Sequence, residues 1–378
     1  MRISRSAARK YTTCPRSYRY HYLDRLRERT ASSFLAFGVA IDESLNAILR
    51  DLKDNKSVSV NYKDVFDEFW QTIKINGRIH NLASTTLVGY AKADFVLELL
   101  QEEDIRFIDA KIAELAPKYS GSDIKELKEF LDDKRSNRSI QLYTDEEAKL
   151  LNIINYLSLR RKGHLMLDAY VAQIVPQIEE VVAIQEKIEL GSDDADISLV
   201  GYIDAIVKFK GFNEICIMDN KTSSTPYENT KVKIDDQLAL YSWAKDLTHA
   251  AFAVMIKQVK LNKEKTCKSC GKIAEEGSRV QKCAVETIPG DKKSRCNGEF
   301  DVVCFPSVET QLLIDPISKE FQEVVMENLG EVAHAIQNNI FPRNLGTCGN
   351  VFGSVCPYLK QCHLGIDDEN LEVVEESK

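Results

Sequence analysis

The sequence predicts an α/β protein in which helices flank a mixed β-sheet. Two apolar stretches, 199–209 and 215–218, are separated by a Gly-Phe-Asn turn, which is the pattern of a β-hairpin, and the second stretch ends in Asp219-Asn220-Lys221. A helical pattern follows over 235–247, and a further apolar strand is expected over 250–261. Strand, helix and strand in that order predict a crossover connection packed against the sheet.

The composition is that of a globular protein with a sizeable core. Of the 378 residues, 44% are apolar and 29% are charged, and the length suggests about two domain-sized units. The net charge of −8 argues against a chain that binds nucleic acid over its whole surface. Residues 1–29 hold nine Lys and Arg against two acids, a net +7, so this segment suits one local contact with a polyanion.

The cysteine content and the absence of long apolar runs indicate the compartment. No run is long enough to span a bilayer, and the N-terminus lacks the apolar segment of a signal peptide. Ten cysteines without a secretory signal favour metal binding in a reducing compartment over a disulfide framework. We therefore expect a cytoplasmic protein without a membrane partner.

The basic N-terminal segment mixes arginines with aromatic residues. A helix is expected over Tyr18–Leu26, with its tyrosines on one side and Arg19 turned outward. This composition suits phosphate contact with base stacking, and a tyrosine-rich core helix with solvated arginines is the alternative. The candidate nucleic-acid-binding residues are Arg16, Tyr18, Arg19 and Tyr22.

A second helix is predicted over 34–50. Its buried stripe consists of Ile41, Leu45 and Ile48, and Asp42 lies at the edge of that stripe. An acid in such a position is more often solvated than functional.

The stretch between this helix and the hairpin has two parts. Residues 62–160 indicate several helices with polar breaks at 118–123 and 132–139, and they carry no recognisable motif. A strand over 181–190 then places alternate residues on one apolar face, where Glu186 either approaches a metal site or faces water at an edge. That face consists of Val182, Ile184, Glu186, Ile188 and Leu190.

The C-terminal part predicts a helix and a tail. The helix is expected over 308–339, and the acidic residues after Gly365 are expected to be disordered. The expected division of the chain is 1–60, 61–180 (helical insertion), 181–262 (core), 263–300 (cysteine insert), 301–365 and 366–378 (acidic tail).

Two acids and a lysine lie at the ends of the hairpin strands. Burying an acid in a strand is costly unless a cation pairs with it. Asp204 and Asp219 could each give one oxygen to Mg²⁺, the backbone carbonyl of Asn220 could give a third, and Lys221 lies on the same strand face as Asp219. An ordinary ion pair at a strand end is the alternative. Downstream, Gln237 and Tyr241 are four residues apart and share one helix face.

Two sets of cysteines have metal-ligand character. A Cys-x-x-Cys knuckle followed by two further cysteines predicts a structural Cys₄ zinc site, formed by Cys267, Cys270, Cys283 and Cys296. A second set, Cys348, Cys356 and Cys362, lacks a fourth member unless Cys14 supplies it, and either an iron–sulfur cube or zinc would fit. Cys216 and Cys304 are expected in the core.

Several motifs follow one another in the order of a known family. The motifs are Cys14-Pro-Arg-Ser-Tyr-Arg-Tyr, Gly38-Val-Ala-Ile-Asp42, Gly201-Tyr-Ile-Asp204, Asp219-Asn-Lys221 and Gln237-Leu-Ala-Leu-Tyr241. This order resembles the RecB-like branch of the PD-(D/E)XK nuclease superfamily, which includes AddB-type helicase–nuclease subunits, CRISPR-adaptation exonucleases and phage exonucleases. The resemblance covers about residues 1–50 and 180–365, and Asp42 stands where the family has histidine.

The resemblance implies a restriction-endonuclease-like fold, with the helical insertion and a small zinc-ribbon-like insertion added to it. It implies that Cys14, Cys348, Cys356 and Cys362 form a [4Fe-4S] staple, although the Cys348–Cys356 interval is longer than in the family. It also implies that acids hold one or two Mg²⁺ or Mn²⁺ ions and that a lysine positions the attacking water. The implied site residues are Asp42, Asp204, Asp219, Asn220, Lys221, Gln237 and Tyr241.

The expected function is that of a metal-dependent DNA exonuclease acting on single-stranded ends, in recombination, repair or phage replication. A helicase or recombination protein is the expected partner. The main alternative is a nuclease-fold protein that binds nucleic acid or assembles a complex without cutting it. A third reading makes the cysteine insert a protein- or DNA-binding module.

Overall fold

The computed structural model describes residues 2–70, 74–75, 78–81, 100, 102–115, 145–192, 195–274, 281–287, 294–349 and 355–374. The chain divides into two compact units. The first unit combines residues 1–81, 170–256 and 310–378, and the second unit combines residues 82–169 and 257–309.

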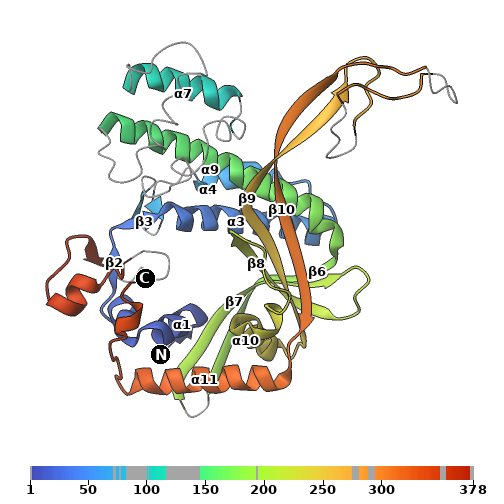
Figure 1. The fold of residues 1–378 in the computed structure, drawn as a ribbon. Helices are drawn as coiled ribbons and strands as arrows, with labels where there is room; N and C mark the ends of the chain where they lie inside the picture. Colours follow the sequence, from blue (N-terminus) through green and yellow to red (C-terminus); the bar gives the residue numbers. More distant parts are fainter. Residues whose placement is uncertain are drawn as a thin grey trace. The chain divides into compact units, whose positions relative to one another are not determined.

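A six-stranded mixed sheet is the centre of the fold (Figure 1). The strand order is β1-β7-β8-β9-β10, and β6 pairs with β7. β7 and β8 are antiparallel and β8 and β9 are parallel, which confirms the predicted hairpin and crossover. The strands are β1 (Arg2–Ser4), β6 (Ile178–Ser192), β7 (Ala195–Phe209), β8 (Ile215–Ser223), β9 (His249–Cys267) and β10 (Phe300–Pro316).

Helices pack against this sheet and against one another. A common core joins Ile203 and Ile217 of the sheet to Leu240 of α10 and Val325 of α11, and α3 contacts β6. The α-helices are α1 (Arg5–Thr13), α2 (Pro15–Tyr18), α3 (Ser33–Asn55), α4 (Tyr62–Trp70), α7 (Glu102–Leu115), α9 (Asp145–Gln173), α10 (Asp236–Lys245) and α11 (Lys319–Gln337). π-helices follow α2 (Arg19–Leu23) and lie near the C-terminus (Lys360–Leu364).

The pairing around β7 leaves a gap along one of its sides. The β7–β8 ladder ends at the pair Ala205–Met218, and β1 pairs with β7 only up to Val200, which lies opposite Ser4. The residues between these two ladders are 201–204. The hairpin ladder therefore ends at the pair next to Asp204 and Asp219.

Helices α3 and α10 confirm their predicted patterns. Ile41, Leu45 and Ile48 of α3 are buried, as their spacing predicts. α10 begins after Asp235, whose carboxylate accepts hydrogen bonds from the backbone N–H groups of Gln237 and Leu238. This cap satisfies donors that the first helical turn would otherwise leave unpaired.

The alternation predicted for the strand over 181–190 is wrong at its start. The pairing register shifts between Val181 and Ala183, so Val181 is buried and Val182 is 39% exposed. An inserted residue of this kind inverts which side chains face the core. Gln185 has φ 49°, and its side-chain amide donates to Asn46 on α3.

The helix predicted over 308–339 is wrong in its first part. Residues up to Pro316 belong to β10, and the helix begins only after Ser318, whose hydroxyl caps it by accepting from Phe321 N–H. Gln311 in β10 donates to and accepts from the backbone of Tyr227, which fixes the extended conformation. The β-branched and apolar residues of this stretch suit a strand as well as a helix.

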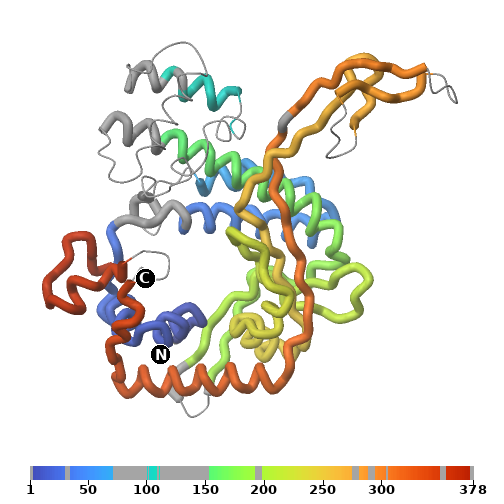
Figure 2. Tube along the Cα trace, in the orientation of Figure 1, coloured from blue at the N-terminus to red at the C-terminus, as the bar shows by residue number. Residues whose placement is uncertain are grey.

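Two short strands that the sequence does not predict join distant segments of the chain, whose path Figure 2 traces. β2 (Leu26–Glu28) pairs with β11 (Leu371–Val373), so Leu26 is not helical and the acidic tail is ordered through this strand. Leu371 is buried at 7% exposure, which supplies the apolar anchor. Residues 375–378 lie outside the described residues.

The predicted helical insertion is described in part. α4, α7 and α9 are helical as expected, whereas β4 (Lys74–Ile75) and β5 (Arg78–Asn81) form a small sheet with β3 (Thr30–Ser32). The predicted breaks at 118–123 and 132–139 lie outside the described residues.

Candidate active site

Two carboxylates face each other just beyond the end of the β7–β8 ladder. Asp219 on β8 is 1% exposed, and Asp204 on β7 is half-buried. Burial and the charge of Asp219 raise the pKa of Asp204 to about 8, and burial also raises the pKa of Asp219. Because these two neighbouring acids resist ionisation, a cation bound between them would lower the free energy of their ionised forms.

A third acid comes from helix α3. Burial raises the pKa of Asp42, and the charges of Glu43 and Asp219 add to the effect. The charge of Asp42 in turn acts on Asp204. The structure therefore brings the three acids predicted from the sequence within electrostatic range of one another.

The oxygens at this site fit a hard divalent cation. Asp204 Oδ2 accepts from the backbone N–H of Asn220 at 2.9 Å. Asp219 Oδ1 is buried and has no hydrogen-bond donor among the described residues. An unsatisfied buried carboxylate oxygen is costly, and Mg²⁺ and Mn²⁺ prefer such oxygen ligands. Asp42, Asp204 and Asp219 could hold such an ion.

A chain of polar contacts leads from the acids to helix α10. Lys221 Nζ lies 2.5 Å from Asp219 Oδ2 and donates to Gln237 Oε1 at 3.2 Å. Gln237 Nε2 contacts the hydroxyl of Tyr241 at 3.2 Å. The predicted pair Gln237–Tyr241 thus shares one helix face and connects to the lysine.

A glycine makes room for this chain. A Cβ atom at Gly201 would lie 3.0 Å from Tyr241 Cε1 and 3.3 Å from Ile188 Cγ1. Only a residue without a side chain lets the tyrosine ring lie directly against β7.

Asn220 has a different set of contacts from the predicted one. Its backbone N–H is bonded to Asp204, and its side-chain Oδ1 accepts from the hydroxyl of Tyr170 at 3.2 Å. A ligand role for its backbone carbonyl remains a prediction. Glu186, the other candidate acid, pairs with Lys245 of α10, so its contact is with a helix and not with the three acids.

Two functional candidates have no sequence signal of their own. Tyr170, at the C-terminal part of α9, is fully buried beside Asn220, and burial together with the charge of Asp204 raises its pKa. Arg5, at the start of α1, contacts Asp236 at 2.5 Å, and its charge lowers the pKa of Asp219. Neither residue belongs to a local motif, because both reach the site through tertiary packing.

The predicted nucleic-acid contacts near the N-terminus divide into two groups. The prediction is wrong for Tyr18, which is 3% exposed and packs against Tyr11 and Phe341. Tyr22 lies against the Tyr18 ring at 5.0 Å, as in the core-helix alternative. Arg19 is exposed and lies 3.6 Å from Asp24, and Arg16 lines a pocket described next.

The four terminal cysteines line one pocket in the first unit. Its walls also include aromatic rings and His363, whose Nε2 lies 3.4 Å from Cys348 Sγ. Burial raises the pKa of Cys356, and the other three thiols add to the effect through their charges. Cys14 thus lies in one pocket with three cysteines that are more than 300 residues further along the chain, and the ligand of this pocket stays a prediction. The cysteines are Cys14, Cys348, Cys356 and Cys362.

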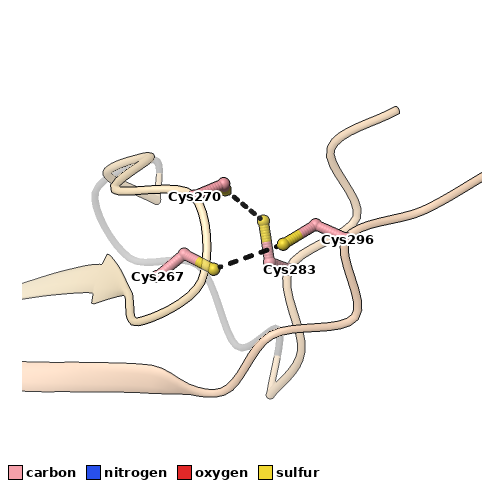
Figure 3. A group of neighbouring side chains, drawn as sticks. All are labelled: Cys267, Cys270, Cys283 and Cys296. Carbon is pink, nitrogen blue, oxygen red and sulfur yellow. Dashed lines mark hydrogen bonds between the residues drawn. The ribbon is translucent and has the colours of Figure 1, made fainter. Parts of the chain in front are cut away.

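The four insert cysteines form a second cluster, in the second unit (Figure 3). Their sulfur atoms all lie within 4.8 Å of one another, with Cys267–Cys296 and Cys270–Cys283 at 3.6 Å. Although burial opposes ionisation of Cys267, the N–H groups of Cys270 and Ser269 hold its pKa at about 6. Four converging thiols of which one ionises readily fit a tetrahedral metal.

The two remaining cysteines, Cys216 and Cys304, belong to neither set. Cys216 is fully buried in β8, as predicted for a core residue. The side chain of Cys304 lies outside the described residues.

Comparison with protein families identifies the chain. The family model of the PD-(D/E)XK nuclease superfamily matches residues 2–115 and 96–363. The chain belongs to the PD-(D/E)XK nuclease superfamily. No curated protein matches the sequence. The mixed sheet with flanking helices is consistent with the restriction-endonuclease-like fold of this superfamily.

Membership agrees with the chemistry of the site. PD-(D/E)XK nucleases use divalent metal ions, and the oxygen-rich cluster around Asp219 offers ligands for one. None of the described helices combines the length and apolarity that crossing a membrane requires.

Mg²⁺ is expected to raise the melting temperature more at pH 8 than at pH 6. Between its ordinary value of 3.8 and its raised value of about 8, Asp204 keeps a proton in the folded protein without metal. The unfolded chain releases that proton, so the metal-free protein loses stability as the pH rises through this window. At pH 6 the cation must displace the proton.

Thermal unfolding at both pH values, with and without Mg²⁺, checks this expectation. Asp204→Asn is expected to remove both the shift and its pH dependence. An equal shift in wild type at the two pH values would contradict it.

Gly201→Ala is expected to destabilise the protein by about 1–3 kcal/mol, because the added methyl group must push the Tyr241 ring or Ile188 aside. Gly191→Ala is a matched control, since a Cβ there meets nothing within 4 Å. Denaturant unfolding of both variants measures the difference. Equal stability of the two variants would show that the ring does not depend on Gly201.

Proposed function

We propose that this chain is a Mg²⁺- or Mn²⁺-dependent DNA exonuclease of the RecB-like branch, acting on single-stranded ends. The observation that carries the proposal is the buried pair of Asp204 and Asp219, with an unsatisfied carboxylate oxygen beside Lys221.

The metal-binding residues are Asp204 and Asp219, with Asp42 and the carbonyl of Asn220 completing the set. A divalent ion held there supplies a Lewis acid that stabilises the charge developing on the phosphate and its leaving oxygen. The acids bind the ion and fix its position. Because each acid loses its proton only with difficulty when the others are charged, a bound cation stabilises their ionised forms.

Lys221 acts as a cation that positions the attacking water and stabilises the phosphate. Burial opposes its charge, but Asp219 raises its pKa above the ordinary value, so the ammonium group stays protonated at neutral pH. A protonated lysine donates hydrogen bonds and does not act as a base. Gln237 holds Nζ in place and Tyr241 holds Gln237, which limits the motion of Lys221.

The cofactor of the terminal pocket is a [4Fe-4S] cluster. Four thiols from the two ends of the chain line one pocket, which supports a single shared cofactor. The insert cysteines hold Zn²⁺, because a Cys-x-x-Cys knuckle with four thiols brought together at one point is typical of structural zinc. Exposed Arg19 contributes to DNA binding near the terminal pocket.

The cellular setting follows from the same chemistry. An iron–sulfur cluster and reduced zinc thiolates suit the cytoplasm. A nuclease that starts from single-stranded ends needs a source of them, so a helicase or a recombination or repair protein is the proposed partner.

Lys221→Ala and Asp219→Asn are each expected to lower DNA cleavage by at least about a hundredfold, because each removes a group that stabilises the charge at the phosphate. The exposed residues Lys187 and Asp54 provide matched controls, as Lys187→Ala and Asp54→Asn. Cleavage of end-labelled single- and double-stranded DNA with Mg²⁺, Mn²⁺ or EDTA measures the effect.

The same assay tests the finer claims. Closed circular single-stranded DNA should resist cleavage while linear DNA is degraded. Undiminished cleavage by Lys221→Ala or Asp219→Asn would overturn the assignment. A protein that binds DNA tightly but never cuts it would support the catalytically silent alternative.

Protein purified without oxygen is expected to be brown and to contain iron and zinc. Cys356→Ser should lose iron and visible absorbance but keep zinc, and Cys270→Ser should lose zinc but keep iron, because the two cysteine sets are separate. Metal analysis and visible spectra of the three proteins check this. Colourless protein with zinc at both sets would contradict the iron–sulfur assignment.

A further inference from the structure

We propose that the zinc arm, defined as residues 257–300, binds the sugar–phosphate backbone of DNA as a contact distinct from the hydrolytic site. The inference rests on the proposed function only in taking DNA as the substrate. Its described residues, 257–274, 281–287 and 294–300, include the end of β9 and the four insert cysteines.

The charge of the arm is opposite to that of the whole chain. It holds eleven Lys and Arg against six Asp and Glu, a net +5, whereas the chain as a whole has −8. A zinc ion with four thiolates contributes −2. The loaded arm therefore still has a net +3, on a protein whose overall charge is negative.

Several of these charges are free to contact a ligand. Lys263, Lys268 and Lys272 are exposed and form no ion pair within the part of the chain that the structure describes. Lys260, by contrast, pairs with Glu309 at 2.5 Å. The three unpaired lysines carry the positive charge to the surface, where a phosphate can reach it.

The lysines are held close to the metal knuckle. Lys268 lies between Cys267 and Cys270, and Lys272 lies two residues after Cys270. The carbonyl of Lys272 accepts a hydrogen bond from Cys267 N–H at 2.9 Å. Gly298 allows the close approach, because a Cβ there would lie 2.7 Å from Cys267 Sγ. A knuckle fixed in this way presents its side chains without a large cost in backbone ordering on binding.

Neutralising the zinc thiolates does not account for this charge. The site needs about two positive charges to balance it, and the arm has a surplus of five. Exposed, unpaired lysines suit an extended polyanion, and a nuclease has one as its substrate.

The test compares two triple variants in an Asp219→Asn background with Ca²⁺, which blocks cleavage without stripping zinc. The arm variant is Lys263→Glu, Lys268→Glu and Lys272→Glu. The control carries the same charge change at Lys53, Lys210 and Lys319, which are exposed lysines of the first unit. Zinc content is measured in both variants.

Binding of labelled single-stranded and duplex DNA is measured by fluorescence anisotropy over a range of salt concentrations. The arm variant is expected to bind at least one form about tenfold more weakly at low salt. Its dependence of log K on log salt should be shallower by about 2 for single strands, because three phosphate contacts are lost. The control should bind like the parent, and equal affinity of the two variants with zinc retained would overturn the inference.

A second measurement separates this inference from the proposed function. With the catalytic residues intact, the arm variant should hydrolyse bis(p-nitrophenyl) phosphate at the parental rate, because that substrate has no extended sugar–phosphate backbone for the arm to bind. Weaker DNA binding with this rate unchanged supports the arm contact. A parent protein that hydrolyses neither this substrate nor DNA would sink the nuclease proposal, while the anisotropy result would still decide on the arm.

Discussion

The electrostatic cost of keeping Asp204 and Asp219 side by side is the constraint on which the site depends. The ladder between β7 and β8 ends at the pair Ala205–Met218, and each of these residues is the chain neighbour of one acid. The backbone hydrogen bonds of the ladder therefore force the two carboxyls together. In water the two charges would separate, but here the hydrogen-bonded ladder prevents it. Lys221 offsets part of the repulsion, and the buried oxygen of Asp219 that lacks a donor shows that the compensation by protein groups is incomplete.

The surroundings of the acids limit how that repulsion can be relieved. Gln237 and Tyr241 restrain the lysine from helix α10, while Asp235 caps the same helix and fixes where its first turn begins. Gly201 lets the tyrosine ring lie against the sheet. The helix cap, the strand pairing and the glycine thus act together. Moving any one of these residues would change the position of the Lys221 ammonium group.

The sequence predicts the hairpin, the crossover and both cysteine sets, because each depends on residues close together or on unusual residue types. It does not predict that Val182 faces outward, since one inserted residue inverts a strand's faces. The burial of Tyr18 and the contact of Tyr170 with Asn220 depend on distant partners that no local pattern reveals. Residues 308–316 suit either a helix or a strand until the pairing of β10 decides.

The pairing of the chain's first residues also governs how the protein can be made. Ser4 pairs with Val200, and Cys14 shares its pocket with Cys362. During synthesis residues 2–14 therefore emerge long before residues 198–200 and 348–362, and their apolar side chains and the Cys14 thiol stay accessible until those segments have left the ribosome. Completion of the first unit is consequently a late event in folding, and a variant that lacks residues 355–374 would expose the same segment as a target for aggregation or degradation.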